Sequence, residues 1–203
     1  MQSITLFVRL AGLLALVMML GSLLGGCAPG PVLTIDVAKH GERPPLVAMT
    51  TDVPVRPAVT GFSAMMSALG ETGPPFPMHF ELMIDDKDVK RINLSSPLTE
   101  LEYVFATPNR MQHFAVRGRC VYLDKYRDQE WQDSRTIETE LQTGQLLVVI
   151  VDLAPGHETF QTLYYLLEDE NYERATQQGN AMTHHWEYSR WLTDFAKSAG
   201  TQL

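Results

Sequence analysis

The stretch Gln145-Leu-Leu-Val-Val-Ile-Val-Asp-Leu153 is nearly all aliphatic. This pattern predicts a central strand covered on both faces, because a strand with one face in water would alternate apolar and polar residues. Several alternating segments precede it, and after Pro155 and Gly156 the apolar spacing becomes helical. Strands followed by helices favour one α+β domain, with an antiparallel sheet or sandwich-like core and a C-terminal helical segment.

The clearest element before this strand is a hairpin. Residues 78–84 alternate, the acidic residues around 85–88 predict a turn, and residues 89–94 return. Residues 41–57 are rich in proline, which favours either an edge strand with loops or a tether. The remaining predicted elements are strands at 32–37, 101–106, 114–123 and 136–141 and a short helix at 62–69.

Two apolar sets after residue 156 have helical spacing. The first predicts an amphipathic helix and consists of Phe160, Leu163, Tyr164 and Leu167. The second predicts a C-terminal helix docked on the core and consists of His185, Tyr188, Leu192, Phe195 and Ala199. The stretch between them, 168–180, is polar.

The first thirty residues have the pattern of a secretory signal. Arg9 is the only charge before an unbroken apolar run at 10–24, and small residues follow. The run is shorter than the roughly 20 residues that a bilayer-spanning helix needs. It ends in Leu24-Gly25-Gly26-Cys27, an aliphatic residue and two small residues before a cysteine.

This ending resembles the lipobox of bacterial lipoproteins. The resemblance implies cleavage before Cys27, whose sulfur would carry a diacylglycerol and whose amine would be acylated. Ala28, in place of an aspartate, implies the outer membrane, with the chain facing the periplasm. The chain then divides into a signal peptide at 1–26, a segment at 27–60 with the lipidated N-terminus, the first strand and the prolines, and a single periplasmic domain at 61–203. A signal anchor, or a plain cleaved signal in which Cys27 is incidental, is the alternative.

The net charge of the chain limits the classes of partner that it is expected to bind. The 203 residues contain 16 Lys and Arg against 24 Asp and Glu, a net charge of −8, and removal of Arg9 with the signal leaves −9. Nucleic-acid binders carry basic faces, so no nucleic acid is expected. An acidic body is not drawn to anionic lipid either, so the lipid itself would hold the chain at the membrane. Cys120 would be the remaining thiol, and it is expected as a small buried hydrophobe.

Catalytic and metal-binding patterns are not found in the sequence. Gly61-Phe62-Ser63-Ala64-Met65 lacks the second glycine of a nucleophile elbow, and there is no His-Glu-x-x-His. The most metal-like patch is His184-His185-Trp186-Glu187, but adjacent histidines on a helix point about 100° apart. The sequence therefore predicts no enzyme, no cofactor and no metal site.

Eight residues are candidate partner contacts. Arg117 and Arg119 share a strand face, where they form either a small cationic site or pairs with acidic neighbours. The run Glu168-Asp169-Glu170 is either a solvated face or a site for a basic partner. The aromatic candidates are Trp186, Tyr188 and Trp191, since Trp and Tyr are enriched at binding hot spots, although core packing of one Trp is expected.

These observations lead to a membrane-anchored lipoprotein that presents a protein-binding domain in the periplasm. The expected role is an envelope assembly or secretion-apparatus accessory factor. One alternative is an immunity lipoprotein that neutralises a secreted toxin, because an acidic surface suits a basic effector. Another is an envelope hydrolase.

Overall fold

The computed structural model describes residues 30–52, 78–94, 100–120, 129–132, 135–153 and 160–203. Apart from Gly30, all of these residues belong to one compact unit, Pro31–Leu203. The predicted signal peptide at 1–26, the lipidation site Cys27 and the predicted helix at 62–69 lie outside the described residues.

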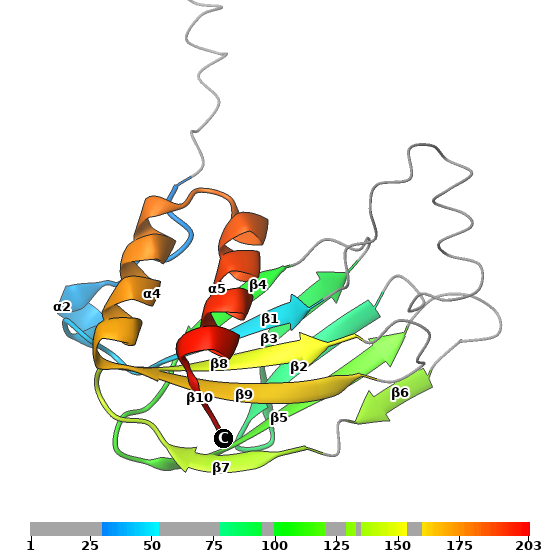
Figure 1. Cartoon of the computed structure of the whole chain (residues 1–203). Coiled ribbons are helices and arrows are strands. Elements are labelled where there is room, and N and C mark those ends of the chain that lie inside the picture. The colour runs from blue at the N-terminus through cyan, green and yellow to red at the C-terminus, as the bar shows by residue number, and fades with distance from the viewer. Residues whose placement is uncertain (1–29, 53–77, 95–99, 121–128, 133–134, 154–159) are drawn as a thin grey trace, which may run out of the picture. The chain divides into compact units, whose positions relative to one another are not determined.

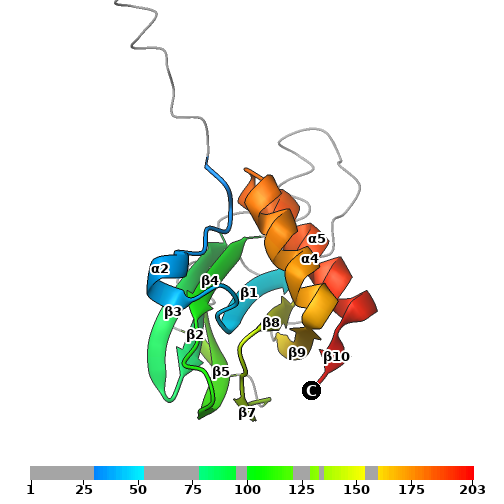
Figure 2. The same cartoon turned by 90° about the vertical axis from the view of Figure 1, so that its left-hand side faces the viewer.

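The folded unit is an α+β structure in three layers: two stacked sheets, with a pair of helices on the outside of one of them (Figures 1 and 2). The first sheet has the order β10-β9-β8-β1-β4. Its strands are β1 (Leu46–Asp52), β4 (Leu101–Phe105), β8 (Gln145–Asp152), β9 (Gln161–Glu168) and β10 (Thr201–Gln202). All its pairings are antiparallel except that of β1 with β8.

The second sheet has the order β3-β2-β5-β6, with β7 also paired to β5. Its strands are β2 (Met78–Ile84), β3 (Lys87–Leu94), β5 (Met111–Cys120), β6 (Gln129–Gln132) and β7 (Ile137–Glu140). The first half of β5 pairs with β7 and its second half with β6, so the long strand holds two short partners on one side. The helices are the single turn α2 (Val37–His40) and the longer α4 (Asp169–Ala181) and α5 (His185–Ala199).

Strand β8 occupies the central position that its sequence predicts. It lies between β1 and β9, and its six residues Leu146–Val151 are all buried. Leu147, Val149 and Val151 belong to the core between the sheets, whereas Leu146, Val148 and Ile150 belong to the core beneath the helices. Both faces are covered, which is why the sequence shows an unbroken apolar run.

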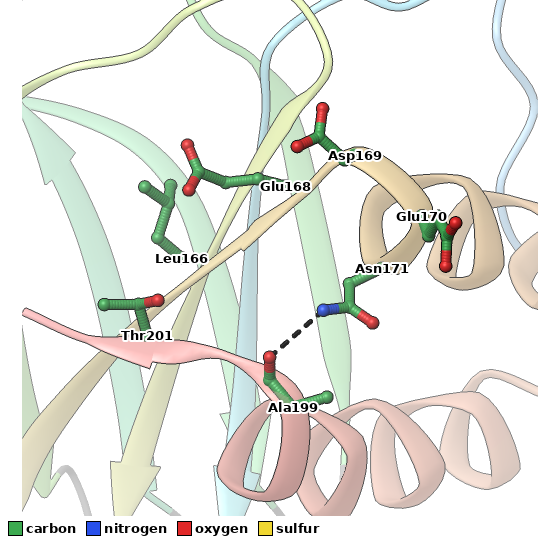
Figure 3. A pocket seen from close by; sticks show the side chains of 7 residues that line it. All are labelled: Leu166, Glu168, Asp169, Glu170, Asn171, Ala199 and Thr201. Carbon is green, nitrogen blue, oxygen red and sulfur yellow. Dashed lines mark hydrogen bonds between the residues drawn. The ribbon is translucent and has the colours of Figure 1, made fainter.

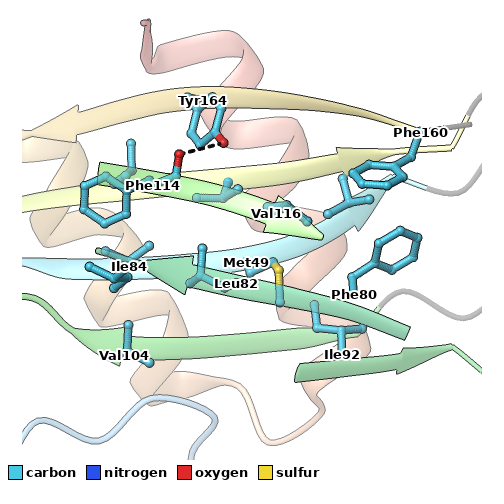
Figure 4. Close-up of a cluster of buried hydrophobic side chains, with 14 of the residues drawn as sticks. Met49, Phe80, Leu82, Ile84, Ile92, Val104, Phe114, Val116, Phe160 and Tyr164 are labelled. Carbon is cyan, nitrogen blue, oxygen red and sulfur yellow. Dashed lines mark hydrogen bonds between the residues drawn. The ribbon is translucent and has the colours of Figure 1, made fainter. Parts of the chain in front are cut away.

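The core between the sheets is built from alternate residues of facing strands (Figure 4). Phe80 and Leu82 of β2 and Phe114 and Val116 of β5 are fully or almost fully buried there. Tyr164 of β9 joins them, and its hydroxyl donates to the Arg135 carbonyl oxygen at 3.0 Å. This interior, with aromatic and aliphatic residues from both sheets, confirms the expected sandwich-like core.

The helices are attached to the first sheet by apolar packing and by buried hydroxyls. The Tyr172 hydroxyl donates to the Pro44 carbonyl at 2.7 Å, and the Tyr188 hydroxyl to the Ala175 carbonyl at 3.0 Å. Burial raises the pKa of Tyr172 to about 12, so this donor keeps its proton at physiological pH. Thr193 of α5 contacts Thr50 of β1, hydroxyl to hydroxyl, at 2.9 Å.

The N-terminal part of the unit differs from prediction in two ways. Residues 32–37 are not a strand, because Val32 and Leu33 pair their amides with carbonyls at the end of α4 and the chain turns into α2 at Val37. The first strand is instead Leu46–Asp52, within the proline-rich segment, and it is neither an edge strand nor a tether. The folded unit therefore begins near residue 31, well before residue 61.

The amphipathic helix predicted from Phe160 to Leu167 is wrong. Residues 161–168 form strand β9, paired along its whole length with β8. The same apolar spacing fits a strand here because both faces of the sheet are covered. The C-terminal helix is confirmed as α5, with Tyr188, Leu192 and Phe195 buried, although His185 at its start is exposed.

The predicted hairpin is confirmed, with a tighter turn than expected. Strands β2 and β3 are joined by two residues, Asp85 and Asp86, with φ angles of 51° and 60°. Two left-handed residues match the turn that suits strand twist, and aspartate tolerates that conformation better than most residues. The strands predicted at 101–106, 114–123 and 136–141 correspond to β4, β5 and β7, with ends shifted by up to three residues in the described part.

Candidate functional site

The predicted acidic run lines an open pocket of about 440 Å³ (Figure 3). The pocket lies where strand β9 passes into α4, beside the end of α5 and strand β10. Its lining residues come from segments some thirty residues apart: Leu166, Glu168, Asp169, Glu170, Asn171, Ala199 and Thr201.

Backbone and amide contacts fix the walls of this acidic pocket. Thr201 of β10 pairs with Leu166 of β9, which extends the first sheet along one side. On the other side the Asn171 amide donates to the Ala199 carbonyl at 3.1 Å and ties α4 to the end of α5. Asp169 has φ 48°, so the chain turns sharply between β9 and α4 at a residue that lines the pocket.

The carboxylates of the pocket are exposed. Glu168 accepts a hydrogen bond from the Gln145 side chain, and among the described residues no cation pairs with Glu168, Asp169 or Glu170. In Figure 3, the side chains of Glu168 and Asp169 point away from α4. The side chain of Glu170, on the helix itself, points in the opposite direction. Carboxylates at the start of a helix also interact favourably with the positive end of the helix dipole. They therefore stabilise α4 as well as making the pocket negative.

The aromatic candidates separate into core and surface. Tyr188 is 2% exposed and belongs to the core beneath α5, so it is not available as a contact. Trp191 is half-buried and stacks on the Tyr188 and Phe195 rings, with ring centroids 5.9 Å and 4.8 Å away. Trp186 is 48% exposed at the first turn of α5. Trp191 is therefore the packed Trp that was expected, and Trp186 remains available as a contact.

The arginine candidate on β5 is neutralised by its neighbours. Arg117 contacts Glu81 of β2, Nε to Oε2, at 3.0 Å, and Asp88 of β3 at 3.0 Å. Arg91 of β3 pairs with the other oxygen of Glu81. The pairing alternative is what the structure shows, and it is a cross-strand charge row on the second sheet. Arg119 lies two residues along β5, and its side chain lies outside the described part.

Glu81 is the centre of this row. Burial alone would raise the pKa of its carboxyl, but hydrogen bonds and charges from Arg117 and Arg91 outweigh burial and lower the pKa below 4.5. A carboxyl with a lowered folded-state pKa stabilises the fold above its unfolded value, and that stabilisation is lost as pH falls through the folded value.

We expect Glu81→Gln to lower the free energy of unfolding at pH 7 by about 1 kcal/mol, because three charged hydrogen bonds, two from Arg117 and one from Arg91, are weakened at a partly exposed site. The difference from the parent should shrink below pH 4.5, the ordinary carboxyl value. Urea unfolding of both chains at neutral and acid pH measures this difference in the free energy of unfolding. Glu102→Gln is the control, because its 3.5 Å pair with Lys90 joins more exposed side chains and should cost less. An equal difference between Glu81→Gln and the parent at both pH values would contradict the lowered pKa of the Glu81 carboxyl.

The described residues do not form a metal-ligand cluster. In that part of the chain, no three His, Cys, Asp or Glu side chains come close enough to hold an ion. Asp85 and Asp88 are engaged by Arg110 and Arg117 respectively. His184 and His185 are exposed on the turn before α5 and at its start.

In comparisons with known proteins, no family model, no curated protein and no solved structure matches the chain. Within the described residues, no helix is both long and apolar enough to cross a membrane.

Proposed function

We propose that this chain is an outer-membrane lipoprotein held by an acylated Cys27, whose periplasmic domain binds a basic segment of an envelope protein in the acidic pocket. The lipobox-like Leu24–Cys27 supports the anchor, and the pocket supports the binding role. The domain would act as an accessory factor of envelope assembly or of a secretion apparatus. Its role would be to bind a partner at the membrane, without catalysis.

The observation that carries the binding role is the position of the exposed Glu168 and Asp169 carboxylates at one pocket, which Glu170 also lines. Lys and Arg side chains reach such a site with long flexible stems, and opposite charge speeds encounter and fixes the register of the partner. The second candidate, an immunity lipoprotein, uses the same chemistry against a basic secreted toxin. The identity of the captured protein separates the two.

Photo-cross-linking in intact cells tests the proposal. A photo-reactive residue at Thr201, on the pocket wall, is expected to capture one envelope protein through a Lys- or Arg-rich peptide, identified by mass spectrometry. The control places the same residue at Glu42, which is exposed outside the pocket. Capture of a secreted toxin at Thr201 would favour the immunity role. Equal capture at both positions, or capture through a peptide without basic residues, would contradict pocket binding.

A further inference from the structure

The chain enters the folded unit beside the turn that joins α4 to α5. The Val32 amide donates to the Met182 carbonyl at 2.9 Å, and the Leu33 amide to the Gly179 carbonyl at 3.1 Å. Val32 and Leu33 are 2% and 3% exposed. Gly179 permits this close approach, because a Cβ at that position would meet the Leu33 Cβ at 2.8 Å. The entry point is therefore fixed to the end of α4 (Figure 1).

The turn beside the entry point is uncharged and carries an exposed indole. Residues 179–186 include no Asp, Glu, Lys or Arg in a chain with a net charge of −8, and the half-buried Glu187 follows them. Thr183, His184 and His185 are exposed there, and Trp186 is the largest exposed hydrophobic side chain among the described residues, with a His184 ring 6.5 Å from its own. Indole rings favour the headgroup layer of a bilayer, where one edge is apolar and the other is wet.

Few residues separate the proposed anchor from the folded unit in the sequence. Four residue steps separate Cys27 from Pro31, and an extended chain covers at most about 3.6 Å per residue, so the two Cα atoms are within about 14 Å. A lipid on Cys27 therefore holds the entry point near the membrane surface. The turn at Met182 is hydrogen-bonded to that entry point and is held there too.

We propose that the α4–α5 turn rests on the membrane that holds the anchor, with the Trp186 indole in the lipid headgroup layer. The proposal rests on the acylation of Cys27 proposed above. Its occupant is the bilayer surface, because the tether is short and residues 179–186 carry no charge, so the half-buried Glu187 is the nearest carboxylate along the chain that anionic headgroups would repel.

This contact gives the domain a defined orientation. The acidic pocket is lined by the first residues of α4, whose 13 residues span about 20 Å. The α4–α5 turn lies at the other end of this helix (Figure 1). With the turn on the bilayer, the carboxylates of the pocket are held away from anionic headgroups and face the periplasm, where a soluble or envelope-bound partner reaches them.

Quenching of tryptophan fluorescence by brominated lipid tests the contact. The full lipidated chain is reconstituted in phosphatidylethanolamine–phosphatidylglycerol vesicles whose acyl chains carry bromine near the carbonyl group. Since the chain has three tryptophans, we expect bromine to remove on the order of a third of the emission. Trp186→Phe should abolish most of this loss, while the matched variant Trp191→Phe, which changes a half-buried ring, should retain it.

Flotation of the vesicles separates the two possible failures. A chain that floats with the vesicles but is not quenched, or is quenched equally in Trp186→Phe, overturns the contact and leaves the anchor intact. A chain that does not float overturns the anchor, and the contact with it. A circular dichroism spectrum equal to that of the parent confirms that each variant folds.

Discussion

A Cys27→Ser chain is expected to lose incorporation of a palmitate analogue, to keep residues 1–26, and to disappear from the outer-membrane fraction. Without the thiol there is no thioether and no lipid-dependent cleavage. The expected fall in labelling and in outer-membrane content is at least about tenfold, because each buried methylene contributes roughly 0.8 kcal/mol to membrane binding. Metabolic labelling with membrane fractionation measures both quantities.

The chain supplies its own control for this experiment. Cys120 is the other cysteine, on strand β5, and Cys120→Ser makes the same chemical change far from the lipobox-like sequence. We expect Cys120→Ser to be labelled, processed and located as the parent is. Labelling of Cys27→Ser at the level of the parent would contradict the anchor.

Neutralising the acidic pocket is expected to weaken binding of a basic peptide by about tenfold, which corresponds to about 1.4 kcal/mol. The variant is Glu168→Gln/Asp169→Asn, which removes two charges with little change of shape. Asparagine also tolerates the left-handed conformation of residue 169, with φ 48°. Fluorescence anisotropy with a labelled hexa-arginine peptide at low salt measures the affinity, since salt screens such contacts.

The matched control is Glu42→Gln/Asp194→Asn, which removes the same net charge from two exposed residues outside the pocket. Non-specific attraction depends on net charge and would weaken equally in both variants. An equal loss of affinity in both variants would therefore contradict the pocket as the binding site, whereas a loss confined to Glu168→Gln/Asp169→Asn supports it.

The sequence predicts well those elements in which the burial of each face produces a distinct pattern of apolar residues. Strand β8 is covered on both faces, so its burial leaves an unbroken apolar run, and the β2–β3 hairpin has one face in the core and one outside. Both patterns follow from local side-chain chemistry alone. Helix α5 is likewise amphipathic, with one face on the first sheet.

Prediction failed where tertiary context overrides local pattern. Strand β9 buries residues on both faces, so Leu163, Tyr164 and Leu167 fit helical spacing equally well. Strand β1 was hidden because prolines flank Leu46–Asp52 without interrupting it. The segment at Val32 was predicted as a strand because its sequence alternates and is rich in β-branched residues, but its amides pair with carbonyls at the end of α4.

The candidate site was predictable in part. Exposure of Glu168–Glu170 follows from charge, whereas the pocket does not, because its walls require Ala199 and Thr201, some thirty residues away. Burial of Tyr188 depends on how α5 is rotated against the sheet, and the sequence around Trp186 and Trp191 left that open. The link from Val32 to Met182, which places the chain entry at the α4–α5 turn, has no sequence signature.

Mass spectrometry of the N-terminal peptide, from protein purified out of membranes, tests the anchored-domain account most directly. The account predicts a peptide that begins at Cys27 and carries a thioether-linked diacylglycerol with an acylated amine. A peptide that begins at any other residue, or that contains Cys27 without lipid, would contradict it.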